Sequence, residues 1–62
     1  MNGNSVLNMK EVSIFLGIGR DKTYELFKQE DFPSIQLGKT YVILEDDLME
    51  WLKDHRGKRV YL

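Results

Sequence analysis

The segment Leu16-Gly17-Ile18-Gly19-Arg20-Asp21-Lys22-Thr23-Tyr24 joins two amphipathic helical patterns within a few residues. Gly17 is expected to close the first helix, because glycine adopts the left-handed conformation of a helix end without steric cost. We expect Ile18 to fill the angle between the helices and Gly19 to be a tolerable N-cap for the second. This spacing predicts a helix-turn-helix, a motif typical of DNA-binding proteins.

The first helix is expected to follow Asn8. Asn8 and Glu11 have the spacing of a capping box, and Leu7 stands where a hydrophobic staple to Val12 would form. The apolar stripe of this helix is expected to contain Met9, Val12, Ile14, Phe15 and Leu16. We therefore expect the folded domain to begin at residue 7, after a flexible polar stretch over residues 1–6.

A second helix is predicted over residues 20–29, ending before Phe32-Pro33 because proline cannot continue the helical hydrogen bonds. Spacings of three and four residues should turn three side chains inward, namely Thr23, Leu26 and Phe27. One outer stripe has the spacing i, i+4, i+8 and consists of Arg20, Tyr24 and Lys28. The remaining outer positions are Asp21, Lys22 and Glu25.

Two short β-prone runs over residues 35–37 and 41–43 flank Gly38-Lys39-Thr40, which predicts a hairpin with Lys39 at its tip. A third helix is expected from Glu45 until Gly57, with acidic residues in its first turn where the helix dipole favours negative charge. Residues 57–62 then form a basic tail. The order predicts a mainly α fold with a two-stranded β-hairpin wing, which is a small winged helix-turn-helix over residues 7–56.

Size and composition limit the functions that this chain can have. Its 62 residues allow one thin core, and it contains no cysteine. We expect the core to use most of the large aromatic residues, Phe15, Phe27, Phe32 and Trp51, so no small-molecule ligand pocket is predicted. No apolar run approaches the roughly 20 residues of a membrane span, and no secretory signal is recognised. We expect a cytoplasmic protein without membrane contact.

The inventory of reactive side chains argues against an enzyme. His55 is the only histidine, so neither a typical zinc site nor a Ser-His or Cys-His nucleophile can be assembled. The carboxylates of Asp46 and Asp47 suit the start of a helix. The Gly17-Ile18-Gly19 sequence is no dinucleotide-binding loop, because Lys22 occupies the third glycine position. We expect no catalysis, no metal and no cofactor.

Charge is unevenly distributed along the chain. The formal net charge of −1 divides into +1 over residues 1–28, −5 over residues 29–52 and +3 over residues 53–62. A negative sum is unusual for a protein that binds DNA, because affinity for phosphates comes largely from basic side chains. One face can still be positive, and the acidic middle is a candidate surface for a protein partner.

The order and spacing of several short motifs resemble one known family. They are Met9-Lys10-Glu11-Val12, Leu16-Gly17-Ile18-Gly19-Arg20, Tyr24-Glu25-Leu26, Phe32-Pro33, Ile35-Gln36-Leu37-Gly38-Lys39, Tyr41-Val42-Ile43 and Asp46-Asp47-Leu48-Met49-Glu50-Trp51-Leu52. From about residue 7 to residue 52 the chain is similar to the excisionase-family DNA-binding domains of mobile elements and prophages, relatives of the MerR-type winged helix. Family members often have Ser at the position of Gly19, Pro at Leu44 and a basic residue at Thr40.

The resemblance implies that the second helix enters the major groove of double-stranded DNA and that the wing reaches the adjacent backbone or minor groove. Arg20 suits base readout, because its guanidinium can form two hydrogen bonds with guanine, although a phosphate contact is the alternative. The expected contacts of the second helix are Arg20, Asp21, Lys22, Tyr24 and Lys28. Those of the wing are Lys39 and Thr40, and further candidate phosphate contacts are Lys10, Arg56, Lys58 and Arg59.

The resemblance also implies a role in directing excision of a mobile element, with an integrase or recombinase, or further copies of the chain, as partners. Two alternatives stay open from the sequence. One is a transcription regulator of a prophage or plasmid. The other is a protein-interaction module that uses the acidic third helix. Asp21 is expected to complement the helix dipole, and Tyr24 either to bond a phosphate or to pack over the wing.

Overall fold

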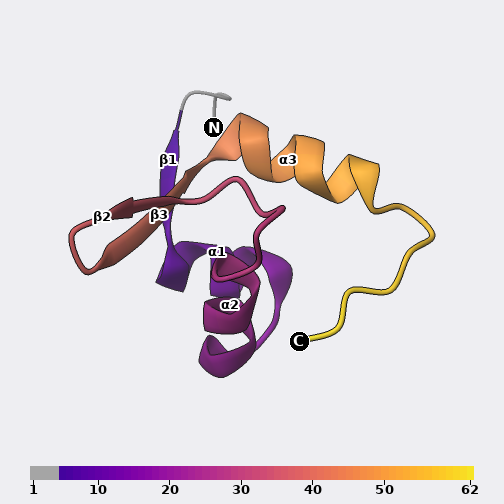
Figure 1. Ribbon diagram of the computed structural model, residues 1–62, viewed down its shortest axis with the longest axis horizontal. Coiled ribbons are helices and arrows are strands. Elements are labelled where there is room, and N and C mark those ends of the chain that lie inside the picture. Colours follow the sequence, from indigo (N-terminus) through magenta and orange to yellow (C-terminus); the bar gives the residue numbers. More distant parts are fainter. Residues whose placement is uncertain (1–4) are drawn as a thin grey trace.

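The computed structural model describes residues 5–62 and places two helices beneath a small sheet, with a third helix on the other side (Figure 1). The elements in chain order are β1 (Val6–Asn8), α1 (Met9–Leu16), α2 (Arg20–Phe27), β2 (Ile35–Leu37), β3 (Thr40–Leu44) and α3 (Glu45–Asp54). The helix-turn-helix, hairpin and third helix therefore follow in the expected order. Of the flexible stretch expected over residues 1–6, residues 1–4 lie outside the described residues, whereas Val6 belongs to β1.

The sheet has three antiparallel strands in the order β1-β3-β2, which corrects the expectation of two. Strand β1 pairs Leu7 with Ile43, and the backbone N–H of Glu45 donates to the carbonyl of Ser5 at 2.8 Å. The strand thus begins at Val6, one residue before the expected start of the domain. Three residues are too few to show the alternation that identifies a strand in a sequence. The pairing partner also lies more than thirty residues away.

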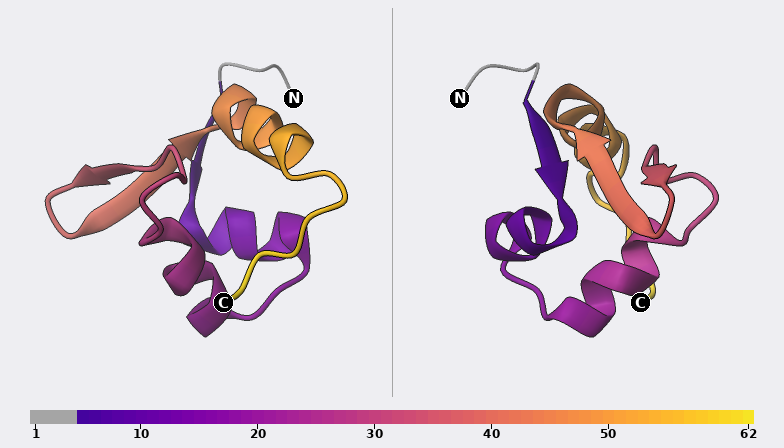
Figure 2. Two further views of the ribbon diagram at one scale, coloured as in Figure 1. Left: turned by 45° about the vertical axis from the view of Figure 1, so that its right-hand side comes forward. Right: turned by 90° about the vertical axis from the view of Figure 1, so that its left-hand side faces the viewer.

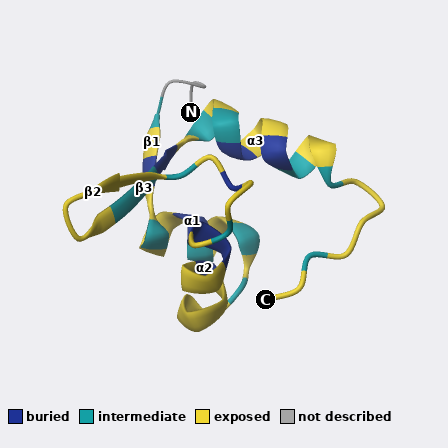
Figure 3. Ribbon diagram, viewed as in Figure 1, coloured by how far each residue is buried: buried dark blue, intermediate teal, exposed yellow. Residues whose placement is uncertain are grey.

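The hairpin formed by β2 and β3 is the wing, and its turn is tighter than expected. Strand β3 begins at Thr40, which pairs with Leu37, so that only Gly38 and Lys39 lie between the strands. Gly38 has φ +62°, a left-handed conformation that favours glycine. The wing extends away from the rest of the protein, and most of its surface is exposed (Figure 3).

The predicted capping box and the predicted glycine C-cap of α1 are both present. The side chain of Asn8 accepts from the N–H of Glu11 at 2.8 Å, and the carboxylate of Glu11 accepts from the N–H of Asn8 at 2.9 Å, which completes the capping box. Gly17 ends the helix at φ +70°, and its N–H donates to the carbonyls of Ser13 and Ile14. These contacts fix where α1 stops and the turn begins.

The turn between α1 and α2 is held from both sides. The hydroxyl of Ser13 donates to the backbone carbonyl of Ile18 at 2.7 Å. The buried hydroxyl of Thr23 donates to the backbone carbonyl of Gly19 at 2.8 Å. Ile18 packs against the core, in agreement with its predicted place between the helices. Helix α2 ends at Phe27, two residues before the expected end, with Lys28 as its C-cap.

The core contains eight buried apolar side chains, Leu7, Val12, Leu26, Phe27, Phe32, Ile43, Leu48 and Trp51. The inward positions predicted for α2 are confirmed, because Thr23, Leu26 and Phe27 are all buried. Two predictions for α1 are wrong: Ile14 is 71% exposed and Phe15 is 52% exposed. Helix α1 covers the core along a narrow stripe through Val12, so side chains farther around its circumference face outward.

Helix α3 lies across the protein from α2, as both views of Figure 2 show. It ends at Asp54 and not at Gly57, and His55 joins its end to the loop after α2. The imidazole of His55 stacks on Trp51, and its Nε2 lies 3.2 Å from Oδ2 of Asp31. None of the helices within residues 5–62 has the length and apolar character that crossing a bilayer requires.

Candidate nucleic-acid interface

Helix α2 and the wing meet through aromatic side chains. The ring of Tyr24 contacts the ring of Tyr41 on β3 edge to face, with 6.0 Å between the ring centres, and Phe27 contacts Tyr41 from the core side at 6.1 Å. Such pairs favour one relative orientation of the two elements. Tyr24 therefore packs against the base of the wing, while its ring remains partly exposed.

Lys28 continues the face of α2 that carries Tyr24. Its ammonium lies 4.7 Å above the centre of the Tyr24 ring and 3.2 Å from Oε2 of Glu25. The hydrogen bond that the Lys28 ammonium donates to Glu25, and the negative charge of that carboxylate, raise the pKa of Lys28 above its ordinary value. The pair is exposed, and exposed ion pairs are weak, so the ammonium is available to a stronger anionic partner such as a phosphate.

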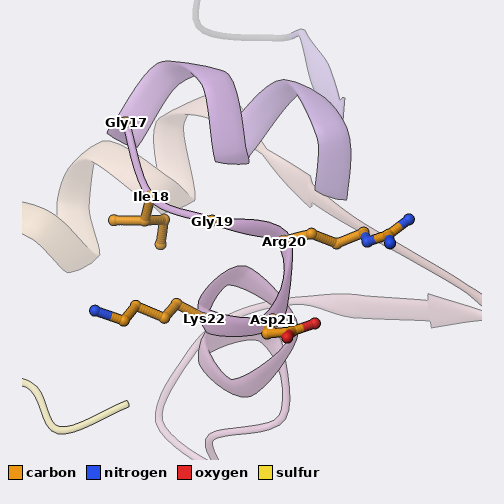
Figure 4. A pocket seen from close by; sticks show the side chains of 6 residues that line it. All are labelled: Gly17, Ile18, Gly19, Arg20, Asp21 and Lys22. Atoms are coloured by element: carbon orange, nitrogen blue, oxygen red, sulfur yellow. The ribbon is translucent and has the colours of Figure 1, made fainter.

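The expected contacts on α2 fall on two flanks of the helix. Figure 4 shows the side chains of Arg20 and Lys22 extending in opposite directions, with Asp21 at the front between them. Arg20 borders a surface hollow that is also lined by Lys10 of α1 and by Thr23. The structure thus brings Lys10 and Arg20 to one region, and it places Lys22 on the other flank.

A second, shallow hollow follows the turn of the helix-turn-helix and is drawn in Figure 4. Its lining consists of Gly17, Ile18, Gly19, Arg20, Asp21 and Lys22. Most of this lining is exposed backbone and charged side chain, and only Ile18 is half-buried. The start of α2 is therefore open to a large partner.

The wing presents Lys39 at its turn and Thr40 at the start of β3, and both are exposed. The amide of Gln36 donates to the carbonyl of Gly38 at 3.1 Å, which ties the turn to its own strand. Arg56, Lys58 and Arg59 are exposed as well, but they belong to the segment after α3, which runs on the side of the molecule away from the wing (Figure 1).

Acidic side chains gather at the other side of the protein. The exposed carboxylates of Asp46 and Glu50 are on α3, and Asp31 joins this region through its contact with His55. The overall charge of −1 is therefore compatible with a positive surface on α2 and the wing. Among residues 5–62, no group of three or more His, Cys, Asp or Glu side chains is arranged to hold a metal ion.

Two features of the interface were not predicted. One is the shared hollow of Lys10 and Arg20, which depends on how α1 crosses α2. The other is a contact of the tail with the end of α2, where the amide of Gln29 donates to the carbonyl of Tyr61 at 3.1 Å. The apolar residues within the basic tail, such as Val60, are the sequence signal for such a contact.

A comparison with protein families matches residues 6–56 to a family described as a helix-turn-helix domain. Searches of curated proteins and of solved structures gave no match. The family match spans every helix and strand that the structure contains between Val6 and Asp54. The chain therefore belongs to the helix-turn-helix domain family, an excisionase-like family of DNA-binding domains.

Proposed function

We propose that this protein is a non-enzymatic, sequence-specific DNA-binding protein whose helix α2 enters the major groove while the wing contacts the adjacent backbone or minor groove. One observation carries the proposal: Arg20, Tyr24 and Lys28 follow one side of α2, and Tyr24 packs on the base of the wing. A helix and a neighbouring hairpin held in this way present two contact elements to a duplex at once.

Arg20 is the proposed base-reading residue. It is the first residue of α2, and side chains from the start of a recognition helix meet base edges. Its guanidinium is exposed at the edge of the hollow that it shares with Lys10. Two parallel hydrogen bonds to O6 and N7 of guanine match the planar guanidinium, and they discriminate against other bases by roughly 1–3 kcal/mol.

The other side chains are proposed to position the protein. Lys10, Lys28 and Lys39 supply ammonium groups that bond phosphates without reading sequence. Thr40 adds a hydroxyl beside Lys39, and Tyr24 adds a second hydroxyl on a residue that packs on the wing and remains partly exposed. Asp21 remains in the first turn of α2, where its carboxylate complements the helix dipole.

The proposed biological role is the direction of site-specific excision of a mobile element. Support comes from membership in an excisionase-like family and from the small size of the domain, which needs a partner or further copies to define a long DNA site. The acidic surface of α3, which lies away from α2, is proposed to contact the recombinase (Figure 2). Control of transcription by the same DNA-binding surface is the alternative.

Selection from a pool of random duplexes tests the DNA-binding proposal. We expect the native protein to enrich a shared motif, the Arg20→Ala variant to lose preference at one base pair of it, and the Lys39→Ala variant to bind all sequences more weakly. Lys53→Ala, on α3, is the matched control for loss of a positive charge. Failure of the native protein to retain any duplex at low salt would overturn the proposal.

The excision role has its own test. Recombination is measured with purified integrase from the same element, with and without this protein. We expect the protein to raise the yield of excised circle, and Arg20→Ala to abolish that gain. An unchanged yield, together with repression of a promoter that carries the selected motif, would favour the transcription regulator.

A further inference from the structure

The C-terminal residues 58–62, here called the docked tail, fold back onto the protein. Gly57 adopts φ +75°, and the N–H of Lys58 donates to the carbonyl of His55 at 3.1 Å, so the chain reverses just after α3. Val60 is half-buried and packs against the core, and the amide of Gln29 donates to the carbonyl of Tyr61 at 3.1 Å. Two separate contacts therefore hold the docked tail beside the end of α2.

The docked tail and the wing lie on opposite flanks of α2. Figure 1 and the left view of Figure 2 both show α2 between the wing and the end of the chain. Lys22 extends from α2 on the flank opposite to Arg20, as Figure 4 shows. The wing-side flank thus has Arg20 and Lys39, whereas the other flank has Lys22 and the docked tail.

Positive side chains on the tail side are available to an external anion. Lys22, Lys58 and Arg59 are exposed, and within residues 5–62 none of them forms an ion pair. The guanidinium of Arg59 lies 5.9 Å from the centre of the Tyr61 ring, a cation–π contact that leaves its hydrogen-bond donors free. Lys58 and Arg59 belong to the docked tail, and Lys22 lies on the flank of α2 that faces it.

A helix in the major groove has a sugar-phosphate backbone on each side. The groove is about 12 Å wide and an α-helix with its side chains is about 10–12 Å across, so both backbones come close to the helix. The wing reaches one of them. We propose that the docked tail, together with Lys22, is a second phosphate clamp that contacts the other backbone. This inference rests on the proposed function of α2 as the recognition helix.

The docking itself is part of the inference. A free basic tail loses conformational freedom when it binds a phosphate, whereas a tail that is already held by Val60 and Tyr61 loses less. Because the docked tail is ordered before it binds, each of its phosphate contacts contributes more to the binding free energy. A change that releases the tail while keeping its charges should therefore weaken DNA binding.

The test measures the association constant K of the protein with one duplex at several salt concentrations. Log K falls as log salt concentration rises, and each phosphate contact adds about 0.9 to the magnitude of that slope. The variants are Lys58→Ala and Arg59→Ala, with Lys53→Ala as the control that removes one exposed charge from α3. Val60→Ser keeps all charges and removes the apolar contact. Circular dichroism melting confirms that each variant is folded.

We expect Lys58→Ala and Arg59→Ala each to lower the slope by about 0.9 and to weaken binding equally for all sequences. Lys53→Ala should leave the slope unchanged, and Val60→Ser should weaken binding without loss of charge. The inference is overturned if the tail variants match Lys53→Ala, or if Val60→Ser binds like the native protein. In those cases, weaker duplex binding by Lys39→Ala still supports DNA contact by α2 and the wing. If the native protein binds no duplex at all, both proposals are overturned.

Discussion

Arg20 and Lys22 are two residues apart and extend to opposite flanks of α2, so their charges face different sides of the helix (Figure 4). A rotation of 100° per residue separates side chains at i and i+2 by more than half a turn. Asp21 lies between them in the first turn of the helix. At the scale of single residues, one helix can therefore combine base readout on one flank with phosphate contacts on the other.

Replacing Arg20 by Lys keeps the positive charge and removes the two-bond fork, which separates readout from general attraction. We expect discrimination at one base pair to fall by about 1–3 kcal/mol, while affinity for unrelated duplexes changes little. Competition with duplexes that differ at single base pairs measures this. Lys28→Arg is the control at a proposed phosphate contact. Retention of the full preference by Arg20→Lys would contradict the assignment.

Gly19 and Gly17 should respond in opposite directions to a side chain. Gly19 is the N-cap of α2 at φ −71° and ψ 166°, with open space where a Cβ would lie, so Gly19→Ser is expected to stabilise the protein by roughly 0.5 kcal/mol. Gly17 also has open space, but its φ of +70° makes Gly17→Ala destabilising by about 1 kcal/mol. Thermal unfolding measures both, and equal shifts in melting temperature would contradict the account.

At the scale of elements, α1 depends on its capping box and on a narrow buried stripe. Asn8 both ends β1 and caps α1, so its side chain fixes the angle at which the strand enters the helix. We expect Asn8→Ala to lower the free energy of unfolding by about 1 kcal/mol, and Asn8→Ser to restore most of it. Chemical denaturation provides the measurement. Equal stability of the two variants would show that the side-chain cap is unimportant.

The exposed side of α1 gives a second prediction for this element. Val12 is fully buried, so Val12→Ala should cost about 2 kcal/mol through lost apolar contact and the cavity left behind. Phe15 is 52% exposed, and Phe15→Ser should change the free energy of unfolding by no more than about 0.5 kcal/mol. A large loss of stability in Phe15→Ser would contradict this exposure and would indicate that the Phe15 ring is part of the core.

At the scale of the whole molecule, the protein separates its charges. Helix α3, whose first turn is acidic, lies on the opposite side of the molecule from α2 (Figure 2). The molecule measures 30 × 26 × 21 Å. The Debye length is about 8 Å at physiological ionic strength and about 30 Å at 0.01 M salt. Salt therefore screens the repulsion between the carboxylates of α3 and DNA phosphates at physiological ionic strength, whereas the repulsion acts across the molecule at about 0.01 M salt.

This separation predicts a salt-dependent effect of α3. The double variant Asp46→Asn and Glu50→Gln should bind DNA as the native protein does near 0.15 M salt, and several-fold more tightly near 0.01 M salt. Fluorescence anisotropy of a labelled duplex at both concentrations measures this. A large gain in DNA affinity near 0.15 M salt would indicate that α3 lies next to the DNA and would contradict the proposed orientation.

Local signals predicted most of the elements, whereas contacts between distant segments were missed. The capping box, the glycine turns and the hairpin are each encoded within a few neighbouring residues, and the structure contains them. Strand β1 depends on pairing with β3, and the docked tail depends on a bond between Gln29 and Tyr61. Phe15 lies outside the core, which helical spacing does not predict, because spacing identifies an apolar stripe but does not show how much of that stripe the neighbouring elements cover.

The proposed position of DNA against α2 and the wing can be checked by NMR titration of the ¹⁵N-labelled protein with a duplex that carries the selected motif. We expect the amide signals of Arg20–Phe27 and of the wing turn at Gly38 and Lys39 to shift or broaden most, whereas those of α3 change little. Shifts confined to α3, with α2 and the wing unaffected, would contradict it.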